Sequence, residues 1–274
     1  MQLQFALNRM CAPQMPFAAF AAMAQRLGVA AIEIRNDLAQ VEMEDGTAGR
    51  QIGAIARDHG LCIRSINALQ RFDQFDDARA GEAQALIDYA LACGAQALVL
   101  CPTNSLRDAR AADRREDDLV AALARLATML ADHGLAGLVE PLGFEECAVR
   151  RKSQAVRGLD AVGRPSCLGL VHDTFHHHLA GEDLFFPELT GLVHVSGVED
   201  PGLAPDAMRD GHRLLVGAAD RLGNAAQLAR LLGAGYQGLV SFEPFADEIA
   251  RAGDIETRLA ASMRHLQLAV GTAH

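Results

Sequence analysis

One repeated pattern constrains the fold of this chain more than any other feature. A run with helical composition ends at a glycine, and a short apolar run follows it directly. Glycine is favoured just past a helix end because it adopts the left-handed backbone conformation without a steric penalty. The pattern recurs at Gly28, Gly60, Gly94, Gly134 and Gly233, so it predicts helices that alternate with short strands along the chain.

The apolar runs indicate eight strands, at 3–6, 30–34, 61–66, 97–100, 135–139, 168–171, 191–195 and 238–242. Helices are predicted at 17–27, 48–59, 79–93, 114–133, 154–162, 224–232 and 255–268, with Ser153 as the N-cap of the fifth and a poorly marked segment at 182–190. Strand starts recur about every 30 residues, as a (β/α)8 barrel of ~250 residues requires. The sequence therefore predicts an α/β fold, a single TIM barrel forming one domain over residues 1–274. The alternative, a doubly wound open sheet, lacks the expected Gly-x-Gly-x-x-Gly turn after its first strand.

Composition and charge argue against some classes of function. The net charge of −10 opposes a nucleic-acid-binding surface, which needs clustered basic residues to displace counterions. No apolar run reaches the ~20 residues that span a bilayer, and the N-terminus carries no signal-peptide pattern. The six cysteines form no Cys-x-x-Cys pair and mostly lie in apolar runs, which favours reduced, buried thiols. We therefore expect a cytoplasmic protein with neither a membrane nor a nucleic-acid partner.

Residues with metal-binding chemistry lie at the ends of four consecutive predicted strands. Glu140, Asp173 and Glu243 come just past their strands, and His194 is the second-to-last residue of its strand. Functional groups of a TIM barrel gather at the carboxyl ends of the strands, so these side chains should meet. Three carboxylates close together repel strongly unless a cation lies between them, which predicts one divalent metal ion. Oxygen ligands with one imidazole suit Mn²⁺, Co²⁺, Zn²⁺ or Mg²⁺. Alternatively, Asp173 only caps the helix that follows it.

Two of these strand ends repeat the pair Glu-Pro, at Glu140-Pro141 and Glu243-Pro244. A residue before proline is restricted to extended geometry, which would hold each glutamate at its strand tip. A metal ion there would polarise a carbonyl and the adjacent hydroxyl of a polyol. The two glutamates could then remove and return a proton at the carbon next to that carbonyl. The pattern therefore predicts acid/base catalysis by Glu140 and Glu243.

Several short motifs are similar to those of one known family. They are Ile32-Glu-Ile-Arg35, Asn67-Ala-Leu69, Glu140-Pro-Leu-Gly143, Gly169-Leu-Val-His-Asp-Thr-Phe-His176, Val193-His194 and Phe242-Glu-Pro-Phe245. On these motifs the chain resembles, over essentially its whole length, the xylose isomerase-like barrels of the sugar-phosphate isomerase/epimerase group. Within that group it is most similar to the inosose (2-keto-myo-inositol) isomerases. The resemblance implies the same four metal ligands, Glu140, Asp173, His194 and Glu243, with the acid/base role on the two glutamates.

The resemblance also implies a substrate site beside the metal. His176, three residues after Asp173, matches a substrate-contacting histidine of the group. Glu146, six after Glu140, matches a substrate-contacting glutamate of the ketose 3-epimerases, a position at which inosose isomerases can differ. Arg213 lies in Gly211-His-Arg-Leu-Leu-Val-Gly217, which is similar to the group's arginine loop. This chain continues that loop as Val-Gly-Ala-Ala, where Pro-Gly-x-Gly is common. Asn67, at the predicted end of the third strand, is expected at the barrel mouth from its position.

The implied function is metal-dependent isomerisation of a keto-polyol, with inosose as the expected substrate and proton transfer through an enediol. Ketose 3-epimerisation, hydroxypyruvate isomerisation and inosose dehydration use the same proton abstraction and stay open as alternatives. A DNA-repair endonuclease on this barrel would need several metal ions and a basic groove, which the net charge opposes. A binding barrel that retains the metal without catalysis is a further alternative. The implied partner is a small polyol or sugar, and a homo-oligomer is also compatible with the sequence.

Other polar residues have structural interpretations. His172 points away from Asp173 on a strand, so it should face the helices. His177 and His178 are expected on the surface at a helix start. The basic run 150–152 is expected to be solvated, with binding of an acidic or phosphorylated group as the alternative. Arg35 is expected to pair with Glu33 or Asp37, or to contact substrate.

Overall fold

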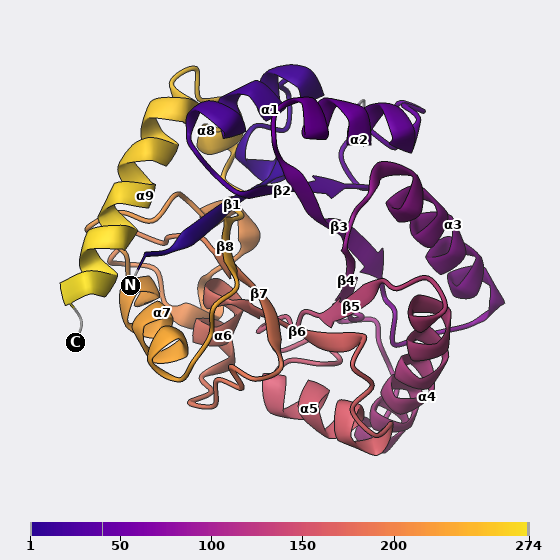
Figure 1. The fold of residues 1–274 in the computed structure, drawn as a ribbon. Coiled ribbons are helices and arrows are strands. Elements are labelled where there is room, and N and C mark those ends of the chain that lie inside the picture. The colour runs from indigo at the N-terminus through magenta and orange to yellow at the C-terminus, as the bar shows by residue number, and fades with distance from the viewer. Residues whose placement is uncertain (1, 40, 273–274) are drawn as a thin grey trace.

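A computed structural model describes residues 2–39 and 41–272 of the protein. Eight parallel strands pair in chain order, and the eighth pairs with the first, so the sheet closes into a barrel (Figure 1). The strands are β1 (Gln4–Asn8), β2 (Ala31–Arg35), β3 (Cys62–Gln70), β4 (Ala97–Cys101), β5 (Ala136–Val139), β6 (Leu168–Asp173), β7 (Thr190–Val195) and β8 (Leu239–Phe242). The predicted (β/α)8 barrel is confirmed, and the first strand begins within the first five residues.

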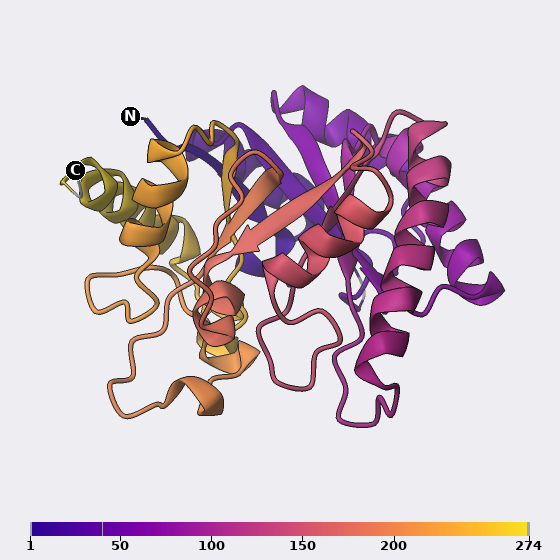
Figure 2. The same ribbon diagram turned by 90° about the horizontal axis from the view of Figure 1, so that it is seen from below.

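Helices surround the barrel and follow the strands (Figure 1). Seven of the described helices lie where the sequence predicted them, and no bounds were predicted for the two short helices Thr174–Ala180 and Asp247–Ala250. They are α1 (Phe17–Arg26), α2 (Gly49–Asp58), α3 (Asp77–Cys93), α4 (Ala112–Ala131), α5 (Lys152–Ala161), α6 (Thr174–Ala180), α7 (Asn224–Gly233), α8 (Asp247–Ala250) and α9 (Ile255–Thr272). Figure 2 shows long connecting loops at one end of the barrel and the N-terminus at the other. Among the described helices, none is both long and apolar enough to cross a membrane.

Alternation along the strands divides the apolar core into two layers. One layer fills the inside of the barrel, and the other lies between the strands and the helices. Val171 of β6 and Leu192 of β7 belong to the inner layer. Two residues further along the same faces come Asp173 and His194, so the strand period itself delivers them to the mouth of the barrel. His172, between Val171 and Asp173, faces the helices as predicted, where it contacts α5 and α7.

The third strand is longer than predicted. It continues past Ile66 to Gln70 because Leu69 and Gln70 still pair with residues of β4. Asn67 therefore lies within the strand rather than at its end. Its buried side chain points to other polar residues inside the barrel.

The fifth helix does not begin at the predicted cap. It starts at Lys152, with Arg151 in the N-cap position instead of Ser153. The Glu182 carboxylate accepts hydrogen bonds from the backbone amides of Lys152 and Ser153, at 2.9 and 3.1 Å. The first amides of a helix have no partner inside it, so an acceptor from anywhere in the fold can satisfy them. Here the acceptor lies in the segment before β7, which local sequence could not reveal.

All six cysteines are free thiols. Four of them are buried, Cys167 is half-buried and Cys62 is exposed. Reduced thiols are thus confirmed, and the barrel is held by packing and hydrogen bonds without covalent crosslinks.

The basic run 150–152 is not simply solvated, because Lys152 is buried behind β6. Its Nζ lies 2.7 Å from Nδ1 of His172 and 2.9 Å from Nδ1 of His177. The other ring nitrogen of His172 lies 2.8 Å from Oε1 of Gln227. His177 is also half-buried, so its predicted place on the surface is wrong. The network ties α5, α6 and α7 to the outer face of the strand that ends in Asp173.

Protonation is costly for the histidines of this network. Burial, together with the charges of Lys152, Arg230 and His178, lowers the pKa of His177 to about 3. Burial and the Lys152 and His177 charges hold the pKa of His172 well below its ordinary value. Burial likewise lowers the pKa of Lys152 to about 7. Both imidazoles are therefore neutral in the folded protein and can accept hydrogen bonds from Lys152.

We predict that His177 makes the fold less stable in mild acid. The unfolded chain takes up a proton on this histidine below about pH 6.5, whereas the folded protein does not until about pH 3. Stability should therefore fall by about 1.4 kcal/mol per pH unit from this group as the pH drops through that window. The free energy of unfolding, measured in urea at pH 7.5 and at pH 5.5, should fall less between these two pH values for His177→Asn than for the wild type. His133→Asn, at an exposed histidine, should keep the wild-type loss; equal losses in all three proteins would contradict the prediction.

Candidate metal centre at the barrel mouth

The structure brings together the four residues predicted as metal ligands. Glu140, Asp173, His194 and Glu243 are all buried, and each offers one ligand atom within 4.8 Å of the others. They come from the carboxyl ends of β5, β6, β7 and β8, which are consecutive neighbours in the barrel. The predicted convergence is therefore present, and the binding of a metal ion by these residues stays a prediction.

His194 lies at the centre of the group. Its Nδ1 is 2.8 Å from Glu140, 3.3 Å from Glu243 and 4.0 Å from Asp173. Burial opposes protonation of this imidazole, but the charges of Glu243, Glu33 and Glu140 outweigh burial and raise its pKa well above the ordinary value. A proton on Nδ1 and a metal ion thus compete for the same position among the carboxylates.

Asp173 caps α6, as one interpretation predicted, and still directs one oxygen at the other predicted ligands. Its Oδ1 accepts hydrogen bonds from the backbone amides of Phe175 and His176, at 2.8 and 3.0 Å, and caps α6. Its Oδ2 faces the other ligands and accepts a hydrogen bond from Arg213 at 2.6 Å. The cap fixes the orientation of the carboxylate, and this leaves one oxygen directed at the mouth.

Glu243 has the most hydrogen-bond donors around it. Its Oε1 accepts from Asn8 at 3.1 Å and from Arg35 at 2.8 Å, and its Oε2 accepts from Arg213 at 3.0 Å. Burial raises the pKa of the Glu243 carboxyl, but His194, Arg213 and Arg35 together hold it well below the ordinary value. Arg35 also forms a bidentate pair with Asp37, as expected, and its pairing with Glu33 does not occur.

Glu33 is a residue of the centre that the sequence interpretation missed. It is fully buried on β2, and its Oε2 lies 3.2 Å from Nε2 of His194. Ser65, Asn67 and Ser241 donate further hydrogen bonds to the same carboxylate. Burial would raise the pKa of Glu33, but His194 and Ser241 lower it to about 2. The sequence signal that could have identified Glu33 is a single glutamate, between Ile32 and Ile34, in an otherwise apolar run. The strand that this run forms has no exposed residue.

The charges of this region fit one divalent cation. Four carboxylates are buried around His194, and when the imidazole is neutral, as metal binding requires, the two buried guanidiniums beside them, Arg35 and Arg213, leave an excess of two negative charges. Buried charges are stable only when they are paired or coordinate a metal. A donor set of carboxylate oxygens and one imidazole suits Mn²⁺, Co²⁺, Zn²⁺ and Mg²⁺, so the residues present fit such an ion.

The predicted substrate residues lie at different depths. Arg213 is buried within the centre, between the rings of Phe175 and Phe245, at 5.1 and 4.6 Å. His176 is buried against the Phe175 ring, and its Nδ1 has no hydrogen-bond partner among the described residues.

The other two predicted substrate residues are Asn67, inside the barrel, and Glu146, on the loop after β5. Asn67 donates to Glu33 and Ser65, so it lies beside His194 within the barrel. Glu146 is half-buried on the loop after β5. It lines a pocket of about 210 Å³ that includes Phe144, Met208 and Arg209 but none of the four predicted ligands.

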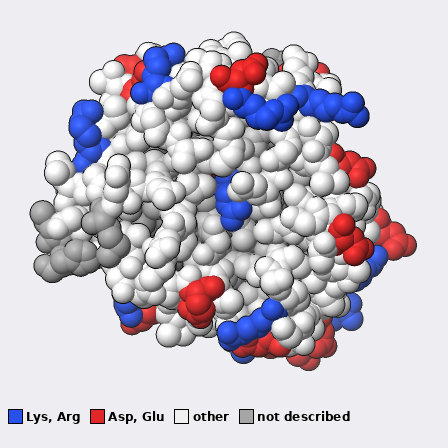
Figure 3. All heavy atoms as spheres, viewed as in Figure 1, with Lys and Arg blue, Asp and Glu red and all other residues white. Residues whose placement is uncertain are grey.

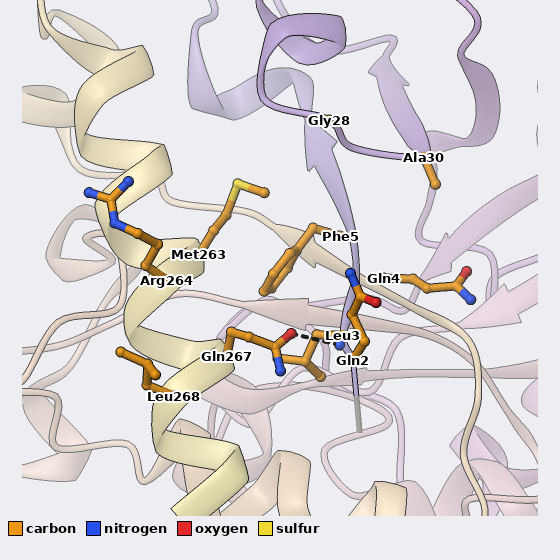
Figure 4. Close-up of a pocket in the computed structure, with 10 residues that line it drawn as sticks. All are labelled: Gln2, Leu3, Gln4, Phe5, Gly28, Ala30, Met263, Arg264, Gln267 and Leu268. Atoms are coloured by element: carbon orange, nitrogen blue, oxygen red, sulfur yellow. Dashed lines mark hydrogen bonds between the residues drawn. The ribbon is translucent and has the colours of Figure 1, made fainter.

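A larger pocket is unsuited to the predicted chemistry. It has a volume of about 650 Å³ and lies between the start of β1 and α9 (Figure 4). Phe5, Met263 and Gln267 point into it, and Gln267 accepts a hydrogen bond from the Leu3 amide. This place is at the amino end of the strands, whereas the predicted ligands lie at the carboxyl end. No carboxylate, imidazole or thiol is among its described lining residues, so it offers no acid/base or metal chemistry.

Charged side chains of both signs are scattered over one face of the molecule (Figure 3). On the face shown in Figure 3, basic side chains are dispersed and interleaved with acidic ones, mostly around the edge. The described residues on this face therefore form no continuous basic surface of the kind that binds nucleic acid.

Comparison with known proteins identifies one matching family and several barrels of similar structure. The sequence matches the family described as xylose isomerase-like TIM barrel over residues 21–269. A xylose isomerase domain containing protein from Salmonella typhimurium is 31% identical, with a TM-score of 0.87 over 100% of this chain and 98% of the other. The IolI protein, solved with a bound zinc atom, is 20% identical, with a TM-score of 0.85 over 99% of each chain. The 3-keto-D-glucoside 4-epimerase of E. coli is 17% identical, with a TM-score of 0.76 over 97% of this chain and 100% of the other. No curated protein matches the sequence.

We predict that Asp173→Asn abolishes metal binding while the fold survives. The amide oxygen can still cap α6, but the second oxygen that faces the other ligands is replaced by an NH₂ group. Metal content of the purified variant, measured by mass spectrometry after loading with Mn²⁺, should fall to background. Glu145→Gln, an exposed change of the same charge on the loop after β5, should retain about one ion per chain. Stoichiometric metal in Asp173→Asn would refute this ligand.

Proposed function

The chain belongs to the xylose isomerase-like TIM barrel family, and we propose that it is a metal-dependent isomerase of a keto-polyol. The observation that carries the proposal is the group of four buried side chains, Glu140, Asp173, His194 and Glu243, with ligand atoms within 4.8 Å of one another. The zinc atom in the IolI protein, which shares this fold, supports the choice of a divalent ion. We propose inosose as the substrate, on the motifs that the chain shares with that subfamily.

The reaction needs a base at a weakly acidic carbon. A divalent ion, when bound, polarises the substrate carbonyl and neutralises the charge that develops on its oxygen. Glu140 and Glu243 approach this position from two strands that are not neighbours, β5 and β8. We propose that one glutamate removes the proton next to the carbonyl and that the other serves the neighbouring carbon.

The two glutamates have different surroundings. Oε2 of Glu140 accepts only a weak hydrogen bond from the Cys101 thiol, at 3.5 Å, among the described residues. Both oxygens of Glu243 accept hydrogen bonds from guanidinium groups. Oε2 of Glu140 is therefore available to exchange a proton with substrate, whereas both oxygens of Glu243 are held by Arg35 and Arg213.

Other residues of the mouth are suited to hold a polyol. The Nδ1 atom of His176 is buried and without a partner among the described residues, so it is available to a substrate hydroxyl. Arg213 extends from the same centre and carries a fixed positive charge toward the developing oxyanion. We propose substrate contacts for both residues, and for Glu146 if the loop after β5 closes over the ligand.

We predict that Glu140→Gln and Glu243→Gln each lose most turnover while keeping the fold. Glutamine has the size of glutamate and can offer one oxygen to a metal, but it cannot accept the proton. Loss of a general base typically lowers the rate by about 10²–10⁴-fold. The rates should be measured at saturating Mn²⁺, with metal content checked, because each glutamate is also a predicted ligand. Glu145→Gln should keep wild-type turnover. Unchanged rates in both glutamine variants would contradict the assignment.

We also predict that the substrate proton exchanges with solvent during turnover. In D₂O, a route through an enediol should place deuterium in the product at the carbon that loses its hydrogen. Scyllo-inosose, hydroxypyruvate and a panel of ketoses should be assayed, with product identified by NMR. A displaced carbonyl indicates isomerisation, and an inverted hydroxyl at carbon 3 indicates the alternative, ketose 3-epimerisation. Complete retention of the original hydrogen would exclude the proposed proton transfer, and inactivity on every keto-polyol would favour a binding barrel.

A further inference from the structure

Glu33 is a charged residue that lies fully buried inside the barrel. Its side chain is inside the barrel with no exposed surface, on a strand that contributes none of the predicted ligands. A carboxylate in such a place is strongly destabilising unless donors compensate it. Within the described part of the chain, its only ionic partner is His194, because Arg35 and Arg213 pair with other acids.

The hydrogen bonds around Glu33 can be assigned unambiguously. The amide Nδ2 of Asn67 can only donate, and it donates to Oε2 of Glu33 at 2.9 Å and to Oγ of Ser65 at 3.0 Å. The hydroxyl of Ser65 then donates to Oε2 of Glu33, and the hydroxyl of Ser241 donates to Oε1. Glu33 is therefore an acceptor at both oxygens. The contact with His194, 3.2 Å from Nε2 to Oε2, consequently needs a proton on Nε2.

This assignment decides which nitrogen of His194 is available to a metal. A neutral imidazole has one protonated and one unprotonated ring nitrogen. With the proton on Nε2 toward Glu33, the lone pair is on Nδ1. Nδ1 is the atom that lies 2.8 Å from Glu140 and 3.3 Å from Glu243. Glu33 of β2 thus orients the ring of His194, and the unprotonated Nδ1 faces the three carboxylates.

We propose that Glu33 is a positioning residue of the metal centre, whose carboxylate keeps His194 protonated at Nε2 and directs Nδ1 to the metal. The inference rests on the proposed metal-dependent function. A carboxylate that accepts the second N–H of a metal-bound histidine fixes its orientation and makes the ligating nitrogen more basic. A glutamine would offer one acceptor oxygen in place of the two to which Ser65, Asn67 and Ser241 donate, and it would lose the ionic contact with His194. Ser65, Asn67 and Ser241, from β3 and β8, hold this carboxylate in place.

The matched variants are Glu33→Gln and Ser241→Ala. Glu33→Gln removes the charge but keeps the size and an acceptor oxygen, and we expect the dissociation constant for Zn²⁺ or Co²⁺ to rise about 10- to 100-fold. The visible absorption of the Co²⁺-loaded protein should also change, because imidazole coordination is weakened. Ser241→Ala removes one donor to the same carboxylate and leaves its charge and its contact with His194, so it should lose clearly less affinity. Chelator-competition titrations measure both constants, and circular dichroism checks the fold.

A second measurement observes the ring of His194 in the wild-type protein itself. In wild-type protein labelled with ¹⁵N-histidine and loaded with Zn²⁺, the His194 signals should show a proton on Nε2 and coordination at Nδ1. Signals missing from His194→Asn assign the ring. A proton on Nδ1, or coordination through Nε2, would overturn the proposal.

The outcomes separate this inference from the proposed function. Wild-type protein that binds no divalent ion contradicts both. Wild-type protein that binds one ion, with an unchanged dissociation constant and Co²⁺ spectrum in Glu33→Gln, contradicts only the role of Glu33. Reduced affinity and a changed spectrum in Glu33→Gln, with near-normal behaviour of Ser241→Ala, support the role of the charge.

Discussion

The repulsion between buried carboxylates at one end of the barrel is the constraint on which the rest of the structure depends. Four acids, all buried, surround a single imidazole. Two arginines neutralise part of this charge. The backbone amides of a helix cap and a set of serine and asparagine side chains stabilise the acids further by donating hydrogen bonds. The charge that the arginines leave matches a divalent cation, and the proposed chemistry uses that cation to stabilise an anionic intermediate.

The barrel tolerates this concentration of charge because its strands cannot move apart. Each of the acids lies on or just beyond a strand paired on both sides, in a closed sheet without edges. Behind β6, the Lys152 network connects three helices to the strand that carries Asp173. The polar centre is therefore supported on its outer side by further buried polar contacts, which explains why Lys152 of α5 is buried.

Local signals in the sequence were sufficient for the fold and for most of the centre. The glycines after the helices predicted that helices and strands alternate along the chain. Because side chains alternate between the two faces of a strand, the sequence also predicted that Asp173 and His194 point into the barrel. What the sequence could not reveal depends on contacts between distant segments. Glu182 caps α5 from another loop, Lys152 is buried by α6, and β3 extends past Asn67 because β4 continues beside it. Glu33 was overlooked because its role follows from a contact with His194, far along the chain.

The central claim is that the four converging side chains hold one divalent ion. Diffraction from a crystal grown with Mn²⁺, with data collected at a wavelength where manganese scatters anomalously, tests this most directly. We expect one anomalous peak per chain, about 2.0–2.4 Å from oxygens of Glu140, Asp173 and Glu243 and from Nδ1 of His194. Absence of a peak at this position, or a peak bound by other residues, would contradict it.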